Sequence, residues 1–596
     1  MQIQESTHHF TASDGTPIFY RHRPAANGNT DRAIVLLHRG HEHSARMMYV
    51  HEELRMDDFA CFAWDARGHG HTSGERGDSP SVGTTINDLD QFIKHIQREH
   101  GIAPENICLI AQSVGAVIAA GWLNDYAPKI RCAILAAPAF KVKLYVPFAR
   151  PALRLAHQLR GNFFVQSYVK SHYLTHDRAR QYSYDHDELI APAISVRVLL
   201  GLYDLGKRVV QNAHQIATPI QMLVSGSDFV VHAAPQHEFY NNLASPIKER
   251  HVFKGFYHDT LGEKQREEAF VQIRRFINER FAETAPTVDT AELQRYLSRR
   301  EADRLATPLS LCSPRGLYWA TVRAAIKWGA KFSEGLKIGR DVGFDSGSTL
   351  DYVYQNQPRG TNTFGTWIDE IYLNAIGWRG IRKRKYHLKQ AINLALDKLH
   401  TARKKVHILD IAAGHGRYVL DALPHDRLPE SVRLRDYSAV NVAVGQKMIA
   451  ERGLEHLVSF EQVDAFNPEN YKKMKPKPTL GIVSGLHELF GDNDLVLQSL
   501  KGFGEAIGKG GYLIYTNQPH HPQLELIARA LTSHKDGRPN WVMRRRSQLE
   551  MDGLVEKAGF HKIAQWIDDD GIFTVSLAVK GAKSPILSEN KSDETE

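Results

Sequence analysis

The sequence predicts an α/β protein with two doubly wound sheet domains joined by a partly helical connector. Short apolar runs alternate with amphipathic stretches over residues 1–284 and again over 401–583. Such runs are typical of buried parallel strands, and their alternation with helices is typical of α/β folds. A chain of 596 residues is also too long for a single core. Each half finally contains one strand–turn–helix unit, with Ser113 at the first turn and Gly414 at the second.

Composition indicates a globular chain in a reducing compartment. Hydrophobic residues make up 42% and charged residues 24%, and no run approaches the about 18 apolar residues of a membrane span. The N-terminus lacks the basic and apolar regions of a secretory signal. Three of the four cysteines lie in apolar runs, which favours buried thiols over disulfides or a metal site. We therefore expect a cytoplasmic protein that binds no metal. The cysteines are Cys61, Cys108, Cys132 and Cys312.

Positive charge is mild overall and concentrated at one place. The formal net charge is +8, which for this length favours solubility over nucleic-acid binding. The run WRGIRKRKYHLK at 378–389 is denser in basic residues, and a solvated helix face is its simplest interpretation. We expect no nucleic-acid partner.

Five buried parallel strands are predicted for the first domain. The apolar runs lie at 33–38, 59–65, 107–111, 132–138 and 220–226. Between the last two runs the chain is too long for one crossover, and it is rich in aromatic and basic residues. We predict an inserted helical cap at about 139–215.

The connector and second domain follow at 285–400 and 401–583. Helical patterns at 290–305 and 387–405 flank a loop-rich segment at 341–365, and a polar tail at 584–596 is expected to be disordered. Six strands are predicted for the second domain. They lie at 406–412, 432–438, 458–465, 480–486, 511–518 and 573–580.

Ser113 lies in the pentapeptide AQSVG, between an apolar strand and a helix. A serine hydroxyl becomes a nucleophile only beside a base, an acid that orients the base, and donors for the oxyanion. A sharp strand-to-helix turn lifts the hydroxyl above the sheet, and small flanking residues permit that turn. Ala111 stands where glycine is usual, which departs from the G-x-S-x-G pattern. Asp228 and His258 follow later strands, in the chain order of α/β-hydrolases.

With HRGHEHS at 38–44 and DARGHGHTSGERG at 65–77, these residues resemble the α/β-hydrolases that include monoacylglycerol lipases and lysophospholipases, often grouped as serine aminopeptidase S33-like. The resemblance implies a Ser113 nucleophile, a His258 base and an Asp228 carboxylate. It also implies an oxyanion hole from the N–H groups of Gly40 and Val114.

Two residues depart from this family. Arg39 and His41 occupy positions where glycine is usual, which either changes the oxyanion hole or adds positive charge beside the substrate. His38, His41 and His43 are expected to form structural hydrogen bonds in a polar loop, and Asp65 and His69 to be structural turn residues.

A glycine turn follows an acidic strand end in VHILDIAAGHGRY, which contains Asp410, Gly414 and Gly416. Glycines allow close backbone approach to a ligand, and Val419 at the third glycine position of a dinucleotide fingerprint argues against NAD. Asp436 ends the next strand, where it suits a ribose diol. Asp464 follows the third strand, where it suits an exocyclic amine.

This three-part pattern resembles the class I S-adenosylmethionine-dependent methyltransferases. The resemblance implies S-adenosyl-L-methionine as cofactor, with Asp410, Gly414 and Gly416 around its methionine part, Asp436 at the ribose and Asp464 at the adenine. His487 and Asn517 follow the fourth and fifth strands, where acceptors bind in open α/β sheets. His487 is either a base or a packing residue, and Asn517 is a candidate for orienting an acceptor.

The whole chain resembles bacterial fusions of an α/β-hydrolase with a class I methyltransferase. We expect a bifunctional enzyme: a serine esterase for acylglycerol or lysophospholipid-type esters, and a methyltransferase of unknown acceptor. Two alternatives remain, namely one inactive half that serves as a binding or regulatory module, and nucleic-acid methylation by the C-terminal half. No membrane span is expected, and peripheral contact with a membrane stays open.

Charge at the first site suggests an anionic ester. Arg39 and four basic cap residues are expected near the entrance, and a guanidinium pairs well with phosphate. The alternative is that Arg39 faces solvent and the cap residues form a solvated face. The cap residues are Lys141, Lys143, Arg150 and Arg154.

Overall fold

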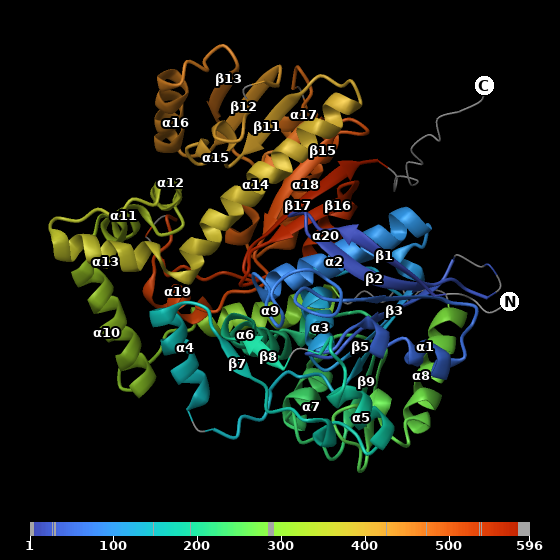
Figure 1. The fold of residues 1–596 in the computed structure, drawn as a ribbon. Helices are drawn as coiled ribbons and strands as arrows, with labels where there is room; N and C mark the ends of the chain where they lie inside the picture. The colour runs from blue at the N-terminus through green and yellow to red at the C-terminus, as the bar shows by residue number, and fades with distance from the viewer. Residues whose placement is uncertain are drawn as a thin grey trace, which may run out of the picture. The chain divides into compact units, whose positions relative to one another are not determined.

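The chain forms two compact units, Met1–Leu293 and Gln294–Glu596, in a computed structural model (Figure 1). The structure describes residues 5–581 except 27, 29–30, 147, 191, 284–290, 425, 473, 536 and 538, and of 291–294 it describes only the backbone. Residues 294–400, expected as part of a connector, belong to the second unit. The tail at 584–596 lies outside the described residues.

The first unit is built on an eight-stranded sheet. Its order is β1 (Ser6–Thr11), β2 (Pro17–Arg23), β4 (Ala60–Trp64), β3 (Ala33–Leu37), β5 (Ile107–Gln112), β6 (Cys132–Ala136), β9 (Ile220–Ser225), β10 (Lys248–Phe253). β2 runs antiparallel to β1 and β4, and all other neighbours are parallel. The five predicted strands are confirmed. β1, β2 and β10 were not predicted. β1 and β10 are edge strands, which carry polar residues, and β2 is polar in its second half, so all three lack a continuous apolar run.

Helices cover both faces of this sheet (Figure 1). On one face α1 (Tyr49–Leu54) and α8 (Glu267–Ala282) share a core with the strands. On the other, α2 (Val82–His100), α3 (Val114–Tyr126) and α6 (Val196–Gln211) pack on one another, and α7 (Ala233–Asn242) packs on α6. Cys61, Cys108 and Cys132 are buried free thiols on three strands, as predicted, and Cys312 is exposed.

The segment between β6 and β9 contains the predicted insertion. It holds α4 (Ala149–Arg160), α5 (Arg178–Asp185) and a two-stranded sheet of β7 (Phe164–Gln166) and β8 (Ala193–Ser195). Its last helix, α6, packs on α3 of the sheet layer. Only the part before α6 is therefore additional to the two helical layers.

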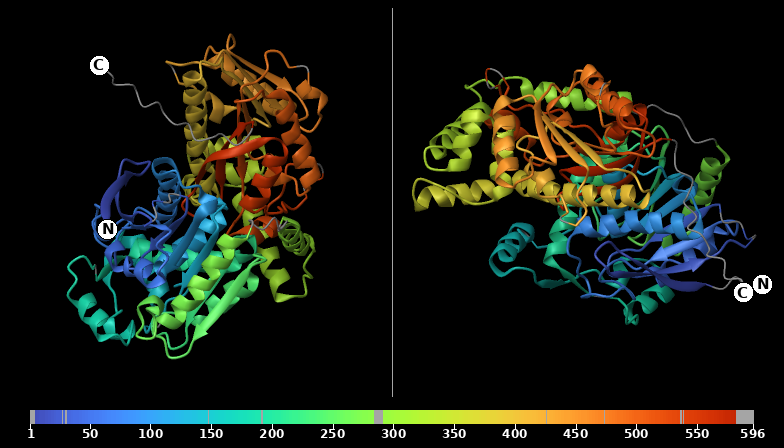
Figure 2. Two further views of the ribbon diagram at one scale, coloured as in Figure 1. Left: turned by 90° about the vertical axis from the view of Figure 1, so that its right-hand side faces the viewer. Right: turned by 90° about the horizontal axis from the view of Figure 1, so that it is seen from above.

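The second unit is built on a seven-stranded sheet (Figure 2). Its order is β13 (Val458–Gln462), β12 (Ser431–Asp436), β11 (His407–Ile411), β14 (Leu480–Val483), β15 (Tyr512–Asn517), β17 (Thr574–Lys580), β16 (Phe560–Ile567). The first five are parallel, and β17 runs antiparallel to both its neighbours. The six predicted strands are confirmed, and the edge strand β16 was not predicted. Strand order reverses between β11 and β14, which in such sheets is where ligands bind.

Helices also cover both faces of the second sheet. One face packs against α14 (Ile376–Thr401) and α16 (Ala439–Glu451), and the other against α18 (Asn493–Ala506) and α20 (Gln548–Lys557). Within α14 the basic run at 378–389 is not one solvated face, because Trp378, Ile381, Arg384 and Leu388 are buried.

Five helices precede α14 in this part of the chain. They are α9 (Ala291–Ala306), α10 (Pro314–Gly329), α11 (Glu334–Val342), α12 (Gly347–Gln355) and α13 (Thr363–Leu373). The prediction of a loop over 341–365 was wrong at α12, which Ser346 caps by accepting from the Thr349 N–H. The pairs α11–α12, α11–α13 and α12–α14 pack together. Among the described residues, no helix has the length and apolar content to cross a membrane.

Candidate active sites

Ser113 occupies the turn between β5 and α3 in a strained conformation. Its φ is 56° and its ψ is −115°, a region that L-residues rarely adopt. Gly115 permits this turn, because a Cβ there would lie 2.5 Å from the His38 carbonyl oxygen. The tight turn that the pentapeptide predicted is therefore present.

A hydrogen-bonded chain links Ser113 to His258 and Asp228. His258 Nε2 lies 2.7 Å from Ser113 Oγ, and His258 Nδ1 lies 2.8 Å from Asp228 Oδ2. The other oxygen of Asp228 accepts from the N–H groups of Val230 and Val231, at 2.7 and 2.9 Å. Burial alone would raise the pKa of Asp228, but His258 and these two amides hold that pKa below its usual range.

The two expected oxyanion donors lie side by side. A Cβ on Gly40 would lie 3.0 Å from Cγ2 of Val114, so the loop after β3 runs directly along the start of α3. Val114 is the first residue of that helix, where backbone N–H groups have no partner within the helix. The backbone N–H groups of Gly40 and Val114 thus lie near Ser113, and their role as oxyanion donors stays a prediction.

Arg39 is shielded from solvent. It is 4% exposed, donates from Nε to Glu42 at 2.9 Å, and its terminal nitrogen lies 3.5 Å from Asp259 Oδ2. The interpretation that Arg39 faces solvent was therefore wrong. Its Nη1 is buried without a hydrogen-bond partner, so positive charge beside the substrate stays a prediction. His41 takes a φ of 70°, so it adopts the backbone conformation for which glycine is usual at that position.

The basic cap residues are also engaged. Lys143 donates to the Asp228 carbonyl at 2.5 Å, and Arg150 and Arg154 both pair with Asp204 of α6. The polar loop residues behave as predicted: both nitrogens of His38 are bonded to backbone, and Asp65 accepts from the N–H groups of Ser44 and His71. Three of the four predicted cap cations are thus engaged, and Lys141 is exposed.

The glycine turn of the second unit follows β11. Gly414 and Gly416 have φ values of 60° and 77°. A Cβ on Gly414 would meet only the Gly347 Cα, at 3.6 Å, whereas one on Gly416 would lie 2.5 Å from Leu434. Gly414 thus leaves backbone open at the turn, and Gly416 allows close packing beneath it.

Three carboxylates stand at the ends of neighbouring strands. Asp436 accepts from the Gly414 N–H at 2.9 Å. Its pairing partner in β13 is Gln462, and Asp464 follows Gln462 by two residues. Asp464 is exposed and accepts from the Phe466 N–H at 2.9 Å.

Asp410 is the buried member of this set. Its Oδ2 accepts from the Tyr418 hydroxyl at 2.6 Å, but its Oδ1 is buried without a partner. Burial and the charge of Asp436 raise the pKa of Asp410 well above its usual range, although the Tyr418 hydroxyl acts in the opposite direction. An unmet buried acceptor favours a cationic donor at this place.

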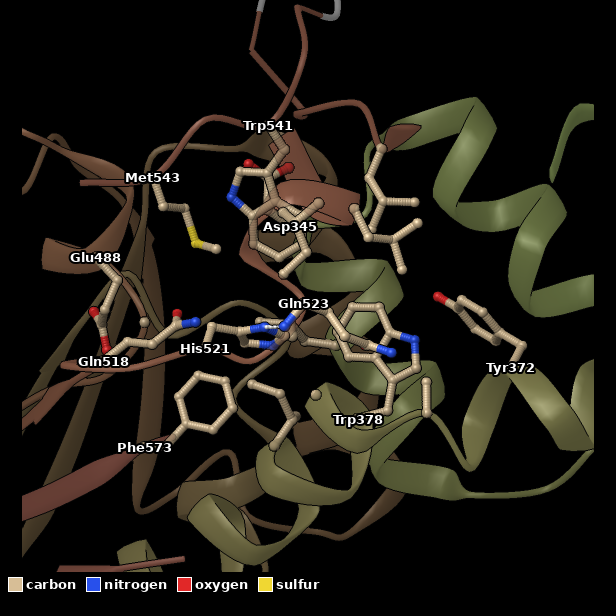
Figure 3. A pocket seen from close by; sticks show the side chains of 18 of the residues that line it. Asp345, Tyr372, Trp378, Glu488, Gln518, His521, Gln523, Trp541, Met543 and Phe573 are labelled. Carbon is tan, nitrogen blue, oxygen red and sulfur yellow. Dashed lines mark hydrogen bonds between the residues drawn. The ribbon is translucent and has the colours of Figure 1, made fainter. Parts of the chain in front are cut away.

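A largely apolar pocket of about 370 Å³ opens at the ends of β14 and β15 (Figure 3). Helices α10–α14 supply one part of its wall, and the segments after β14 and β15 supply the rest. Its polar side chains include Asp345, Arg384, Glu488, Gln518 and His521. The helices that sequence analysis treated as a connector thus build a ligand-sized cavity.

His487 and Asn517 do not line this pocket, while their neighbours Glu488 and Gln518 do. His487 is buried 3.3 Å from Ser499 Oγ, and burial together with the Arg546 charge lowers its pKa to about 3. Asn517 donates to the Arg546 carbonyl at 3.1 Å and borders a much smaller cavity. The pocket-lining residues Glu488 and Gln518 therefore each follow a predicted residue by one position.

Helix α12 separates the pocket from the glycine turn. Leu350 lines the pocket, whereas the next residue, Asp351, pairs with Arg417 directly after the turn. Gly347, at the start of the same helix, approaches Gly414. The pocket and the glycine turn therefore share one wall.

Fold and sites thus define an α/β-hydrolase unit followed by a Rossmann-like unit. The family model described as "Putative methyltransferase" matches residues 273–580, just over half of the chain, and the model described as "Serine aminopeptidase, S33" matches residues 28–265. The chain belongs to the family of the first model, and its N-terminal unit carries the hydrolase domain of the second.

The chain is also similar to individual proteins. The "Uncharacterized protein YnbC" of Escherichia coli (strain K12) is 54% identical over 96% of this chain and 98% of its own length. The "Monoacylglycerol lipase" of Mycolicibacterium smegmatis is 23% identical over 44% of this chain and 92% of its own. A crystal structure of the Paleococcus ferrophilus monoacylglycerol lipase matches 47% of this chain and 100% of its own, with 21% identity and a TM-score of 0.39.

Proposed function

We propose that the chain is a bifunctional enzyme, with a serine esterase in its first unit and an S-adenosylmethionine-dependent methyltransferase in its second. The hydrogen-bonded series Ser113, His258 and Asp228 is the observation that carries the first half. Ser113 is the nucleophile, His258 takes its proton, and Asp228 fixes the imidazole tautomer. Gly40 and Val114 supply backbone N–H groups for the oxyanion.

The proposed substrates of the first unit are acyl esters of the glycerol or lysophospholipid class. The similarity to monoacylglycerol lipases supports this class. The pairing of Arg150 and Arg154 with Asp204 weakens the reason for favouring an anionic ester, although Nη1 of Arg39 has no partner. Neutral monoacylglycerols are therefore the first substrates to test.

A fluorophosphonate tests this half. The full chain should be labelled at one serine, and Ser113→Ala should remove the label. Ser245→Ala is the matched control, because that hydroxyl donates to the Ile247 carbonyl and should leave labelling unchanged. Labelling of the Ser113→Ala variant at the wild-type rate would refute the assignment.

The residues of the second unit fit S-adenosylmethionine. The buried, unpartnered Oδ1 of Asp410 offers an acceptor for the methionine ammonium, and Gly414 leaves the backbone open there. Asp436 would bind the ribose and Asp464 the adenine, with Gly416 supporting the turn. When bound, this cofactor supplies an electrophilic methyl group, and the chain contributes mainly positioning.

S-adenosylhomocysteine tests the second half without turnover. It should raise the unfolding temperature of the full chain, since a ligand selective for the native state stabilises it, and NADH should not. Gly414→Val should abolish the effect, whereas Gly508→Ala, where a Cβ meets nothing within 4 Å, should retain it. Stabilisation by NADH alone would contradict the assignment.

A further inference from the structure

Two oppositely charged side chains line the pocket of the second unit, and each has an unmet hydrogen-bonding group. Glu488 is 9% exposed; its Oε1 accepts from Thr516 at 2.7 Å, but its Oε2 has no partner. Arg384 is 3% exposed, and its Nε has no partner. Leaving such groups buried and unsatisfied is costly, so each marks a position where a ligand atom would be stabilised.

Arg384 also lacks a carboxylate partner. Among the residues that the structure describes, no carboxylate lies within ion-pair distance of it; the Tyr354 hydroxyl lies at 3.5 Å and the centre of the Phe573 ring at 5.3 Å. Burial would lower the pKa of Arg384, but the charges of Tyr354 and Glu488 raise it. Glu488 therefore acts on Arg384 electrostatically, without direct contact.

The rest of the pocket is suited to an apolar body. Figure 3 shows Glu488 and Gln518 together at one side and Tyr372 at the opposite side. Between them lie the polar side chains of Asp345, His521 and Gln523. Most of the remaining wall is apolar or aromatic and includes Ile326, Leu336, Trp378, Ile527, Trp541 and Phe573. Such a cavity binds a mainly apolar molecule and fixes it through a few polar groups.

Charge complementarity selects the polar end of that molecule. A carboxylate would face the negative Glu488, and an ammonium would face the positive Arg384. A neutral hydroxyl can donate to Glu488 Oε2 and accept from Arg384, so it meets both requirements.

Arg384 places this polar end near the strand ends that carry the glycine turn. A Cβ on Gly485 would lie 3.4 Å from the Arg384 guanidinium. Gly485 follows β14, which pairs in parallel with β11, the strand of Asp410.

We infer that this pocket binds the methyl acceptor, and that the acceptor is a largely apolar alcohol held by Glu488 and Arg384. This inference rests on the methyltransferase function proposed above. The hydroxyl oxygen attacks the methyl carbon of the sulfonium donor, and the C–S electron pair passes to sulfur. The hydroxyl proton moves to Glu488 and then to water. The products are the methyl ether, S-adenosylhomocysteine and one proton.

Photoaffinity labelling tests the inference on the full chain without a methyl donor. The probes are a long-chain alcohol with a diazirine in the chain and its methyl ether, in which a methyl group replaces the hydroxyl proton. Mapping by peptide mass spectrometry should place the alcohol on pocket segments within 366–384 and 518–543. Half-maximal labelling should need at least about ten times more ether than alcohol, because the ether cannot donate a hydrogen bond to the charged Glu488.

Two variants localise the effect. Glu488→Gln preserves shape and should weaken alcohol labelling about tenfold while leaving ether labelling unchanged. Ala375→Phe, which fills the pocket, should weaken both. Glu455→Gln is the matched control, because Glu455 is exposed, and it should behave as wild type.

Label confined to the first unit, or equal labelling by the two probes, would overturn the inference, as would a Glu488→Gln variant that labels like wild type. Calorimetry with S-adenosylhomocysteine on the same preparation separates the two proposals. If S-adenosylhomocysteine binds and the alcohol does not label the pocket, the inference fails and the methyltransferase proposal stands. If the pocket is labelled and S-adenosylhomocysteine does not bind, the acceptor role fails with the methyltransferase proposal.

Discussion

Arg39 and Asp259 form a buried ion pair, with 3.5 Å between the guanidinium nitrogen and the carboxylate oxygen. Arg39 lies in the loop that carries Gly40, and Asp259 directly follows His258. Asp259 also accepts from Gln112, the residue before Ser113, at 3.0 Å. This pair therefore ties together the three loops that form the hydrolase site.

Arg39→Met should destabilise the first unit. It removes Arg39 from both Glu42 and Asp259, which keep Arg46 at 3.0 Å and Arg180 at 3.3 Å. Because these second cations remain, the cost should lie near the lower end of the about 3–5 kcal/mol for breaking a buried pair. Arg98→Met is the matched control, because the exposed Arg98–Glu99 pair should contribute about 0–1 kcal/mol. Denaturant unfolding measures both. A stable Arg39→Met protein that lost only its hydrolysis of lysophospholipids would restore Arg39 as a substrate-binding residue.

Asp228→Asn should keep the fold and lose most ester hydrolysis. An amide at this position presents the wrong partner to His258 Nδ1, so the imidazole takes the unproductive tautomer; kcat should fall by roughly 10⁴. The control is Asp204→Asn, since Asp204 is exposed and pairs with Arg150 and Arg154. A loss of less than about tenfold in kcat for Asp228→Asn would show that His258 is oriented by another group.

Binding of S-adenosylhomocysteine should release a proton from Asp410. The pKa of Asp410 is raised in the free protein, and a bound ammonium favours the ionised form, so affinity should increase with pH. The same raised pKa makes this carboxyl lower the free energy of unfolding as pH rises from its unfolded pKa to its folded one.

Calorimetry in two buffers of different ionisation enthalpy measures the released proton. Asp410→Asn should remove the release and weaken binding about tenfold, as expected for a charged hydrogen bond. Asp421→Asn, a partly exposed acid paired with Lys385 and Arg452, should change neither. Affinity that decreases with rising pH would contradict this role of Asp410.

Substitution of Gly414 and Gly416 by alanine should distinguish the glycine that a ligand approaches from the glycine that packs against the protein core. The Cβ of Gly414→Ala would make only an ordinary van der Waals contact, so the strain of a positive φ should account for most of the lost stability, about 1–2 kcal/mol. The same Cβ should weaken S-adenosylhomocysteine binding. Gly416→Ala adds a 2.5 Å contact with Leu434 and should cost more stability. Thermal unfolding and calorimetry compare the two; the reverse ranking in stability would show that the turn packs differently.

The hydrolase site could be predicted from the sequence because Ser113 and Asp228 follow apolar strands and His258 comes after them in the chain order of α/β-hydrolases. Ser113, Asp228 and His258 lie at the ends of β5, β9 and β10, so chain order alone brought them together. Arg39 could not be placed, because burial beside Glu42 and Asp259 depends on tertiary packing. His41 likewise gave no sign that it would adopt a φ of 70°.

The acceptor side of the second unit could be located only approximately. His487 and Asn517 identified the two strand ends, but the short helical turn at His487–Leu489 decides which side chain faces the pocket, and it selects Glu488. The pocket itself could not be predicted from the sequence, because part of its wall comes from helices such as α12, whose polar sequence resembles that of a loop.

Isolation of an acyl-enzyme on Ser113 tests the central claim about the hydrolase site most directly. Wild type should turn over a p-nitrophenyl ester with a burst of about one equivalent, and acid quenching should trap the acyl group. Peptide mass spectrometry should find the acyl mass on Ser113, and Ser113→Ala should show neither burst nor adduct. An adduct on a different residue, or wild-type hydrolysis by Ser113→Ala, would contradict the account.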